Sequence, residues 1–260
     1  MARKPRVHFP GALYHVICRG NQRQRIFRVD ADRIRYLELL NQYRVRYPFQ
    51  LRAYVLMANH AHLLLEVGKH PLGKIMQGLQ QSYTLYFNRR YRLVGHLFQG
   101  RYKDILCDRD EYLLELVRYI HLNPVRAKMV SDPADYLWSS HRDYLNSGSV
   151  KAAAMVQCDW VLNQFAPDPG RARSKYLAFV LDGIGSGHRD DFYDVKEQRF
   201  LGDASFVERI NRSLDLEPTG PVKVDLSAIE AAVVRRYHYP GKLLYSPTKE
   251  HRGSVARAVV

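Results

Sequence analysis

Two histidines separated by one residue are the first feature of this 260-residue sequence that points to chemistry. Side chains alternate between the two faces of an extended strand, so His60 and His62 point to the same side of the segment ANHAHLLLEV. Glu66 shares that side, where it is expected to accept a hydrogen bond from a histidine or to touch a metal itself. Most histidines at this spacing are ordinary hydrogen-bonded residues, so the spacing alone leaves a metal site and a structural role open.

A second polar group lies about sixty residues later, in the segment RYIHLN. Residues four apart share one side of a helix, so Tyr119 and Asn123 are neighbours there, and Tyr112 lies on the same edge as a rival to Tyr119. A phenol is a poor nucleophile at pH 7 because its reference pKa is about 10, and it needs a metal-polarised target or a nearby base. Two imidazoles with an amide oxygen would form such a metal site, which predicts metal-assisted attack of a tyrosine on a phosphodiester.

The tyrosine and the asparagine also have ordinary explanations. Asn123 precedes Pro124, and this pair is typical of the start of a new helix, here over residues 124–130. Tyr119 could instead pack its ring at the boundary of the core and expose its hydroxyl. The spacing leaves both alternatives open.

The segments that must position these residues alternate between strand and helix periodicity. An α+β fold is expected, with a ferredoxin-like antiparallel sheet and helices packed on one face, followed by a mainly helical C-terminal region. The expected domains are a nuclease domain over residues 1–145, a linker and helical segment over 146–200, and a small helical region over 201–260. Strands are predicted over residues 13–19, 50–57 and 97–107, and a tight turn at residues 58–59 leads from the second of these into the histidine strand that ends at Val67. Helices are predicted over residues 32–47, 71–91 and 111–123.

The charge is distributed very unevenly along the chain. Residues 1–130 carry 23 lysines and arginines against 9 aspartates and glutamates, whereas residues 131–260 carry 17 of each sign. So basic a first half favours binding of a polyanion, of which nucleic acid is the commonest, although a solvated basic surface without a partner remains the alternative. The expected path for a DNA strand is marked by basic residues at Arg19, Arg23, Arg25, Arg89, Arg90, Arg101, Lys103 and Arg126.

Several classes of protein are disfavoured by composition. No apolar run reaches the roughly 20 residues needed to cross a bilayer, and no secretory signal opens the chain, so a cytoplasmic protein without a membrane partner is expected. The three cysteines are far apart, which argues against a disulfide framework or a cysteine zinc site. There is neither a Walker loop nor a Rossmann glycine pattern, so no nucleotide cofactor is expected.

Three phrases of the sequence carry a family resemblance: FPGALYHVICRGN, NHAHLLLEV and LFQGRYKDILCDRDEYLLELVRYIHLNPVRA. Together they resemble the single-tyrosine transposases with a His-hydrophobic-His motif, and most closely the REP-associated tyrosine transposase branch. The resemblance covers about the first 145 residues. It implies a ferredoxin-like nuclease domain that acts on single-stranded DNA.

The resemblance also implies the roles of four residues. His60 and His62 would bind Mg²⁺ or Mn²⁺, Asn123 would replace the third ligand on the helix, and Tyr119 would be the nucleophile. The implied reaction cleaves single-stranded DNA near a REP-like hairpin and leaves a 5′-phosphotyrosine and a 3′-hydroxyl that can rejoin. Many relatives have glutamine where this sequence has Asn123.

The remaining expectations concern the tail, the oligomeric state and the alternative function. The segment from Ile229 to Val260 resembles the start of the duplex-binding helical domain of the bacterial replication initiator, which implies a truncated DNA-binding domain. The short segment 122–126 after the tyrosine favours a monomer that acts in cis. The alternative function is a non-catalytic module that binds structured RNA or DNA hairpins, with structural histidines.

Overall fold

The structure is a computed structural model that describes residues 7–146, 155–185, 200–215, 231 and 234–236. The chain divides into two compact units, Met1–Ile210 and Asn211–Val260. The segment with the resemblance to the replication initiator lies largely outside the described residues. All the elements discussed below belong to the first unit, except the end of the last helix, α7 (Ala204–Asp215).

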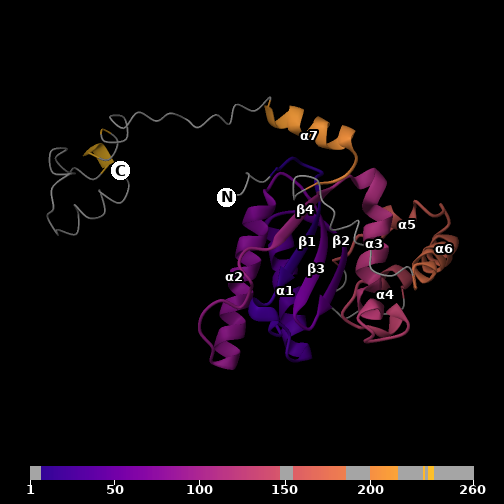
Figure 1. The fold of residues 1–260 in the computed structure, drawn as a ribbon, viewed down its shortest axis with the longest axis horizontal. Helices are drawn as coiled ribbons and strands as arrows, with labels where there is room; N and C mark the ends of the chain where they lie inside the picture. Colours follow the sequence, from indigo (N-terminus) through magenta and orange to yellow (C-terminus); the bar gives the residue numbers. More distant parts are fainter. Residues whose placement is uncertain (1–6, 147–154, 186–199, 216–230, 232–233, 237–260) are drawn as a thin grey trace. The chain divides into compact units, whose positions relative to one another are not determined.

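A five-stranded sheet forms the centre of the first unit (Figure 1). Its strands are β1 (Leu13–Arg19), β2 (Phe49–Met57), β3 (His60–Val67), β4 (Lys103–Cys107) and β5 (Phe200–Leu201), in the order β2-β3-β1-β4-β5. The first four strands pair antiparallel, and β5 pairs parallel to β4. The predicted α+β class is confirmed, and the sheet gains a short edge strand at the expected boundary between the segment 146–200 and the helical region 201–260.

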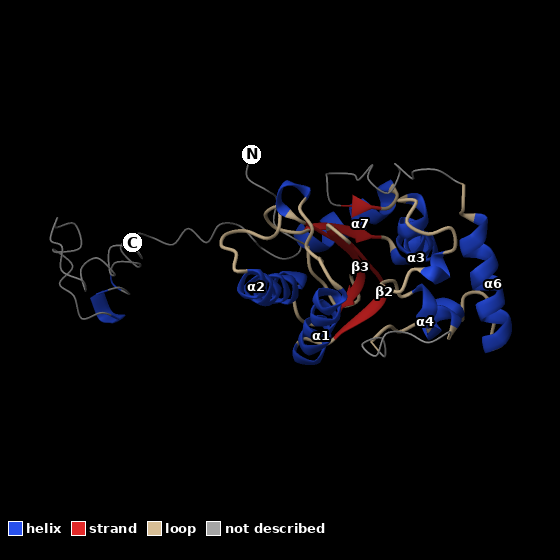
Figure 2. Cartoon of the chain, turned by 90° about the horizontal axis from the view of Figure 1, so that it is seen from below, coloured by secondary structure: helices blue, strands red, loops and turns tan. Residues whose placement is uncertain are grey.

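Helices cover both faces of the sheet (Figure 2). The helices α1 (Asp30–Arg46) and α2 (Leu72–Tyr91) lie on one side, and α3 (Arg109–Arg126) lies on the other. The expectation of helices on one face therefore needs correction, because nearly every side chain of β2 and β3 is buried and both faces need a cover. None of the described helices is both long and apolar enough to cross a membrane.

The remaining helices follow α3 in the chain. They are α4 (His141–Leu145), α5 (Asp159–Leu162) and α6 (Pro169–Asp182), with short 3₁₀ turns η1 (Asn21–Arg23) and η2 (Pro133–Asp135) elsewhere. The helix α6 packs against α3 and α4, on the side of α3 that faces away from the sheet (Figure 2). Residues expected to be a linker and a helical segment over 146–200 thus include two helices that belong to the compact unit.

The helices α1 and α2 are joined through one buried carboxylate. Asp32 accepts hydrogen bonds from the backbone N–H groups of Arg28 and Val29, which satisfies donors at the start of α1. It also accepts from the hydroxyls of Tyr86 and Tyr91 on α2, at 3.2 and 2.7 Å. A single aspartate therefore caps one helix and fixes the position of the next.

The β2–β3 hairpin turns at residues 58–59, as predicted, and contains a bulge that the sequence did not suggest. Leu51 pairs with Leu65 and Ala53 pairs with Leu64, so Arg52 is the extra residue. The bulge interrupts the alternation of side chains along β2 and turns Arg52 toward Glu66.

The helix α3 begins two residues earlier than expected, at Arg109, and ends three residues later, at Arg126. The Asp108 carboxylate accepts from the backbone N–H of Asp110 and caps the first turn. Pro124 lies inside the helix, which continues to Arg126, so the new helix predicted over residues 124–130 is wrong. A proline removes one backbone donor, and here the packing around α3 tolerates that loss.

A buried polar network fixes α6 to α3 and α4. The Tyr176 hydroxyl lies 2.7 Å from Nδ1 of His121 and 2.7 Å from Nδ1 of His141. Nε2 of His121 lies 2.7 Å from the Ser140 hydroxyl. All four side chains are buried, and hydrogen bonds in such surroundings are costly to leave unmade.

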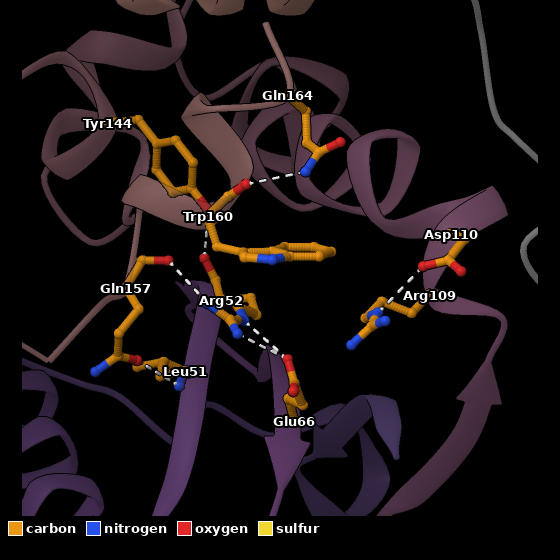
Figure 3. A network of polar contacts seen from close by, with 9 residues as sticks. All are labelled: Leu51, Arg52, Glu66, Arg109, Asp110, Tyr144, Gln157, Trp160 and Gln164. Atoms are coloured by element: carbon orange, nitrogen blue, oxygen red, sulfur yellow. Dashed lines mark hydrogen bonds and ion pairs between the residues drawn. The ribbon is translucent and has the colours of Figure 1, made fainter. Parts of the chain in front are cut away.

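A second contact fastens α5 to the sheet (Figure 3). Arg52 forms two hydrogen bonds with one oxygen of Glu66, at 2.8 and 3.1 Å, and its guanidinium lies 5.3 Å from the Trp160 ring centre. Arg109 at the start of α3 lies 5.1 Å from the same ring. Trp160 thereby contacts cations from both the sheet and α3.

Removal of the Tyr176 hydroxyl should loosen α6. We expect Tyr176→Phe to lower the free energy of unfolding by about 1–3 kcal/mol, because two buried histidine nitrogens lose their partner. Urea denaturation followed by circular dichroism measures the change. Tyr47→Phe, at a half-buried tyrosine that ends α1, is the control and should stay within about 0.5 kcal/mol. An equal effect of the two substitutions would contradict the assigned network.

Candidate functional site

A pocket of about 580 Å³ opens between the sheet and the C-terminal half of α3. Strands β1, β2, β3 and β4, the loop before β4, and α3 with the residue that follows it contribute side chains to its walls. The residues that line it are Ile17, Arg19, Met57, His60, His62, Gln99, Arg101, Lys103, Tyr119, Asn123, Arg126 and Ala127. The pocket therefore brings together both predicted histidines, the predicted tyrosine and the predicted asparagine.

The orientation of His60 is set by the residue before it. Nδ1 of His60 lies 2.7 Å from Oδ1 of Asn59, and Nδ2 of Asn59 donates to the carbonyl of Arg23 at 3.3 Å. Because the Asn59 oxygen can only accept, Nδ1 of His60 carries the proton. The lone pair of His60 is then on Nε2, which is the atom a metal ion would need.

His62 is oriented by a third histidine, on the neighbouring strand β1. Nδ1 of His62 lies 2.8 Å from Nε2 of His15, and the two rings stack with centres 5.1 Å apart. His15 is completely buried, whereas His62 reaches the pocket. Since its Nδ1 is engaged by His15, the ring nitrogen of His62 that remains for a ligand is Nε2.

The three imidazoles are neutral at pH 7. Burial lowers the pKa of His15 to about 3, with a smaller effect of the Lys103 charge. Burial lowers the pKa of His60 to about 4, helped by Arg19, and holds the pKa of His62 well below its usual range. Neutral imidazoles keep a lone pair, so the site is suited to a cation even though it is surrounded by basic residues.

Tyr119 is buried at the wall of the pocket, next to the histidines. Its ring contacts those of His62 and His15 edge-on, with centres 5.9 Å apart in both pairs. The Arg126 guanidinium lies 4.9 Å from the Tyr119 ring centre and donates to the Tyr119 carbonyl at 3.0 Å. Tyr112, the rival from the sequence, is not among the residues that line the pocket.

Asn123 lies one helical turn beyond Tyr119 and also lines the pocket. Its Nδ2 donates to the Tyr119 carbonyl at 2.9 Å, so its amide oxygen is not used in that bond. The helix continues past it, which removes the alternative that Asn123 caps a new helix. The described residues contain no cluster of three histidine, cysteine, aspartate or glutamate side chains that could hold a metal, so a metal here would take two imidazoles and Asn123, water or substrate oxygens.

Glu66 does not take part in the pocket, contrary to expectation. It lies at the other end of β3, where its carboxylate pairs with Arg52 (Figure 3). The bulge that turns Arg52 toward Glu66 is the reason, since it gives this carboxylate a buried cation to neutralise. The expected contact of Glu66 with a histidine or a metal is therefore corrected to a structural ion pair.

The predicted basic residues fall into two sets. Arg19, Arg101, Lys103 and Arg126 line the pocket. The others lie outside its lining: Arg23 and Arg25 in and after η1, and Arg89 and Arg90 at the end of α2, where Arg90 also pairs with Asp32 at 3.5 Å. The first set can contact a phosphate held in the pocket, whereas the second can only contact nucleic acid that extends beyond it.

Two residues of the site were missed by the sequence interpretation, His15 and Asn59. A signal for Asn59 existed, because it directly precedes His60 in the hairpin turn. His15 belongs to the same face as Ile17 and Arg19, but its contact with His62 depends on the register of β1 against β3, in which Ile17 is opposite His62.

The comparisons with known proteins identify one matching family model. The family model described as IS200-like transposase matches residues 9–123, which span β1 to α3 and include His60, His62, Tyr119 and Asn123. This part of the chain, which makes up less than half of the 260 residues, is similar to the IS200-like transposases. The match ends within α3, at the predicted third ligand Asn123.

Solved structures resemble the chain more distantly. One, described as a REP-associated tyrosine transposase bound to a REP hairpin, is 16% identical, covers 59% of this chain and 90% of that one, and has a TM-score of 0.49. Another, from Deinococcus radiodurans R1 and assigned as a transposase, is 18% identical, covers 45% of this chain and 94% of that one, and has a TM-score of 0.34. No curated protein matches the chain significantly.

Stability should depend on pH because of the buried histidines. The pKa values of His15, His60, His62, His121 and His141 are all lowered by burial from the reference value of 6.5. The stabilisation from keeping them neutral is complete above about pH 6.5, and it declines below that pH because the unfolded chain takes up protons first. We expect the free energy of unfolding to fall between pH 7 and pH 5, by up to about 1.4 kcal/mol per pH unit for each histidine. Urea denaturation at several pH values measures it, and a flat profile would contradict the assignment.

Glu66 should matter for stability and not for the pocket. We expect Glu66→Gln to lower the free energy of unfolding by about 1–3 kcal/mol, because Arg52, which is only 8% exposed, loses its counter-charge. The affinity of the pocket for Mn²⁺ should not change. Glu38→Gln, in an exposed pair with Arg35, is the matched control and should have little effect on stability. If Glu66→Gln weakens Mn²⁺ binding and leaves stability unchanged, Glu66 contributes to metal binding and the assigned ion pair is wrong.

Proposed function

We propose that this transposase domain is a metal-dependent nuclease that cleaves and rejoins single-stranded DNA through Tyr119. The observation that supports this most directly is the position of the Tyr119 ring against the His62 ring, in a pocket that Arg19, Arg101 and Lys103 also line. A nucleophile, neutral imidazoles and cations for a phosphate thus share one site.

The proposed step exchanges one phosphate ester for another. The phenol oxygen of Tyr119 attacks the phosphorus atom and forms a new P–O bond, while the bond from phosphorus to the 3′-oxygen breaks. The phenol loses a proton and the departing 3′-oxygen gains one, so no proton is consumed overall. The product is a 5′-phosphotyrosine, and attack by a 3′-hydroxyl in the reverse direction rejoins the strand without a nucleotide cofactor.

The residues fit a divalent cation of the Mg²⁺ or Mn²⁺ type. His60 and His62 would hold it through their Nε2 atoms, with the amide oxygen of Asn123 as a third ligand. When bound, such an ion polarises the phosphodiester and neutralises charge that develops on its oxygens. Asn59 orients His60, Arg126 contacts the Tyr119 ring, and the pocket arginines and Lys103 attract the phosphate.

The proposed substrate is single-stranded DNA next to a REP-like hairpin, as the sequence resemblance implies. The basic residues outside the pocket support this, because Arg23 and Arg25 in the loop after β1 and Arg89 at the end of α2 are exposed. Phosphates of a structured flank could contact these residues while the scissile phosphate occupies the pocket.

Tyr119 and the two histidines of one site belong to the same chain, which supports a monomer that acts in cis. Contacts between α6 and α3 also favour this arrangement, because Arg118 on α3 donates to the carbonyl of Phe179 at 3.3 Å and its guanidinium lies 4.2 Å from the Phe179 ring centre. A helix that is held on its outer side by its own chain is less easily exchanged with a second copy.

The nucleophile can be tested by trapping the covalent product. The chain is incubated with Mn²⁺ and a 5′-labelled or 3′-labelled single strand that carries a hairpin, and the products are separated on denaturing gels. The wild-type protein should become linked to the fragment on the 3′ side of the cut, so only the 3′ label should migrate with the protein. Tyr119→Phe should reduce this adduct by at least about 100-fold, because the attacking oxygen is absent.

Controls separate the nuclease from the alternative of a binding module. Tyr112→Phe should form the adduct normally, and Tyr119→Phe should still bind the strand in a gel-shift assay. His60→Ala and His62→Ala should lose the adduct while retaining the fold. Binding by the wild-type chain with no adduct on any strand would favour the non-catalytic hairpin-binding module.

A further inference from the structure

We infer that His15 is a positioning residue that holds the His62 ring with Nε2 toward the pocket. The inference rests on the proposed function, in which His62 binds a divalent cation. His15 itself is fully buried and does not line the pocket, so it would act through His62 and would contact neither the cation nor the DNA.

The contact between the two rings is specific. Nε2 of His15 lies 2.8 Å from Nδ1 of His62, within the normal range for a hydrogen bond between ring nitrogens. The planes are 21° apart, so the rings also stack, and the Tyr119 ring contacts both of them edge-on. Together these contacts leave the His62 ring little freedom to rotate about its bond to Cβ.

The hydrogen bond also decides which His62 nitrogen has a lone pair. If Nε2 of His62 binds a cation, its Nδ1 must carry the proton and donate it, so Nε2 of His15 must accept. His15 can do this as a neutral imidazole with its own proton on Nδ1. Asn59 serves His60 in the same way, since its side-chain oxygen accepts from Nδ1 of that histidine. Each of the two proposed histidine ligands thus has one buried or half-buried acceptor behind it.

Packing alone does not account for a histidine at position 15. Its second nitrogen, Nδ1, is buried and has no hydrogen-bond partner among the described residues. An unpaired buried polar atom is unfavourable. An apolar side chain at position 15, like those of Leu13 and Val16 in the same strand, would not carry this cost. The contact with His62 is what the imidazole provides and an apolar side chain would not.

Binding of Mn²⁺ alone to the full chain tests the inference without reference to activity. In isothermal titration, His15→Leu should weaken Mn²⁺ binding about 10–100-fold, the usual effect of losing a hydrogen bond behind a histidine ligand. His15→Gln should retain most of the affinity, because its side-chain oxygen reaches a position close to that of Nε2 and can accept. Pulsed electron paramagnetic resonance of bound Mn²⁺ should show coupling to two imidazole nitrogens in wild type and a changed coupling in His15→Leu.

His141→Gln is the matched control. His141 is also fully buried, also has one ring nitrogen bonded and also has one without a partner among the described residues. It belongs to the network of α4 and α6, so its substitution should lower stability and leave the Mn²⁺ affinity unchanged. Urea denaturation of each variant shows how much stability has been lost.

The possible results separate this inference from the proposed function. If His15→Leu binds Mn²⁺ with the same affinity and the same nitrogen coupling as the wild type, the role of His15 is overturned and the proposed function still stands. A wild-type chain that binds no Mn²⁺ would overturn both. If His15→Leu does not fold, His15→Asn replaces it, because its shorter side chain cannot reach His62, and equal affinities for His15→Asn and His15→Gln would overturn the inference.

Discussion

The packing of α3 against the face of the sheet that carries the histidines is the constraint on which the site depends. A buried stripe that includes Leu113, Leu116 and Ile120 faces the sheet, and this fixes the rotation of the helix. Each residue of a helix is turned by about 100° from the last, so a rotation by one position would remove Tyr119 from the pocket. The outer side of α3 is held as well. Gly183 after α6 approaches so closely that an added Cβ would lie 2.8 Å from the Arg118 side chain. The residues that follow α3 therefore help to determine where Tyr119 lies.

Sequence periodicity predicted the elements of the domain well, because it reports contacts between near neighbours. The strand over residues 13–19, the hairpin turn after Met57 and the helix that ends at Tyr91 lie as expected. The alternation of side chains also placed His60 and His62 together, and helical spacing placed Tyr119 beside Asn123. The same reasoning failed where one residue interrupts a period. The bulge at Arg52 changed the role of Glu66, and packing on both sides of α3 carried the helix through Pro124.

Contacts between segments that are far apart in the chain could not be predicted from a single sequence. His15 and His62 are 47 residues apart, and their contact requires the register of two strands that are not consecutive in the chain. The packing of helices on both faces of the sheet could not be predicted for the same reason. It depends on which face α3 covers after β4 has paired with β1. The paired strand β5 lies more than ninety residues after β4 and is two residues long, too short to carry a periodic signal. Residues 155–185 were interpreted as separate from the domain for a related reason, because the partners of Trp160 and Tyr176 lie on β2, α3 and α4.

Among the described residues, buried histidines occur in two settings that differ in their surroundings. His121 has both ring nitrogens bonded and is enclosed by Tyr144 and Tyr176, whose rings lie 5.2 and 6.1 Å away. His62 has one nitrogen bonded to a buried neighbour, and it lines a pocket together with several cations. An unpaired buried nitrogen is not the distinguishing feature, since both His15 and His141 have one. What differs is access to solvent. Aromatic rings separate His121 from solvent. His15 contacts His62, which lines a pocket large enough for a phosphate. Burial keeps both sets neutral, but only in the second set does neutrality leave a lone pair that a substrate-bound cation could reach.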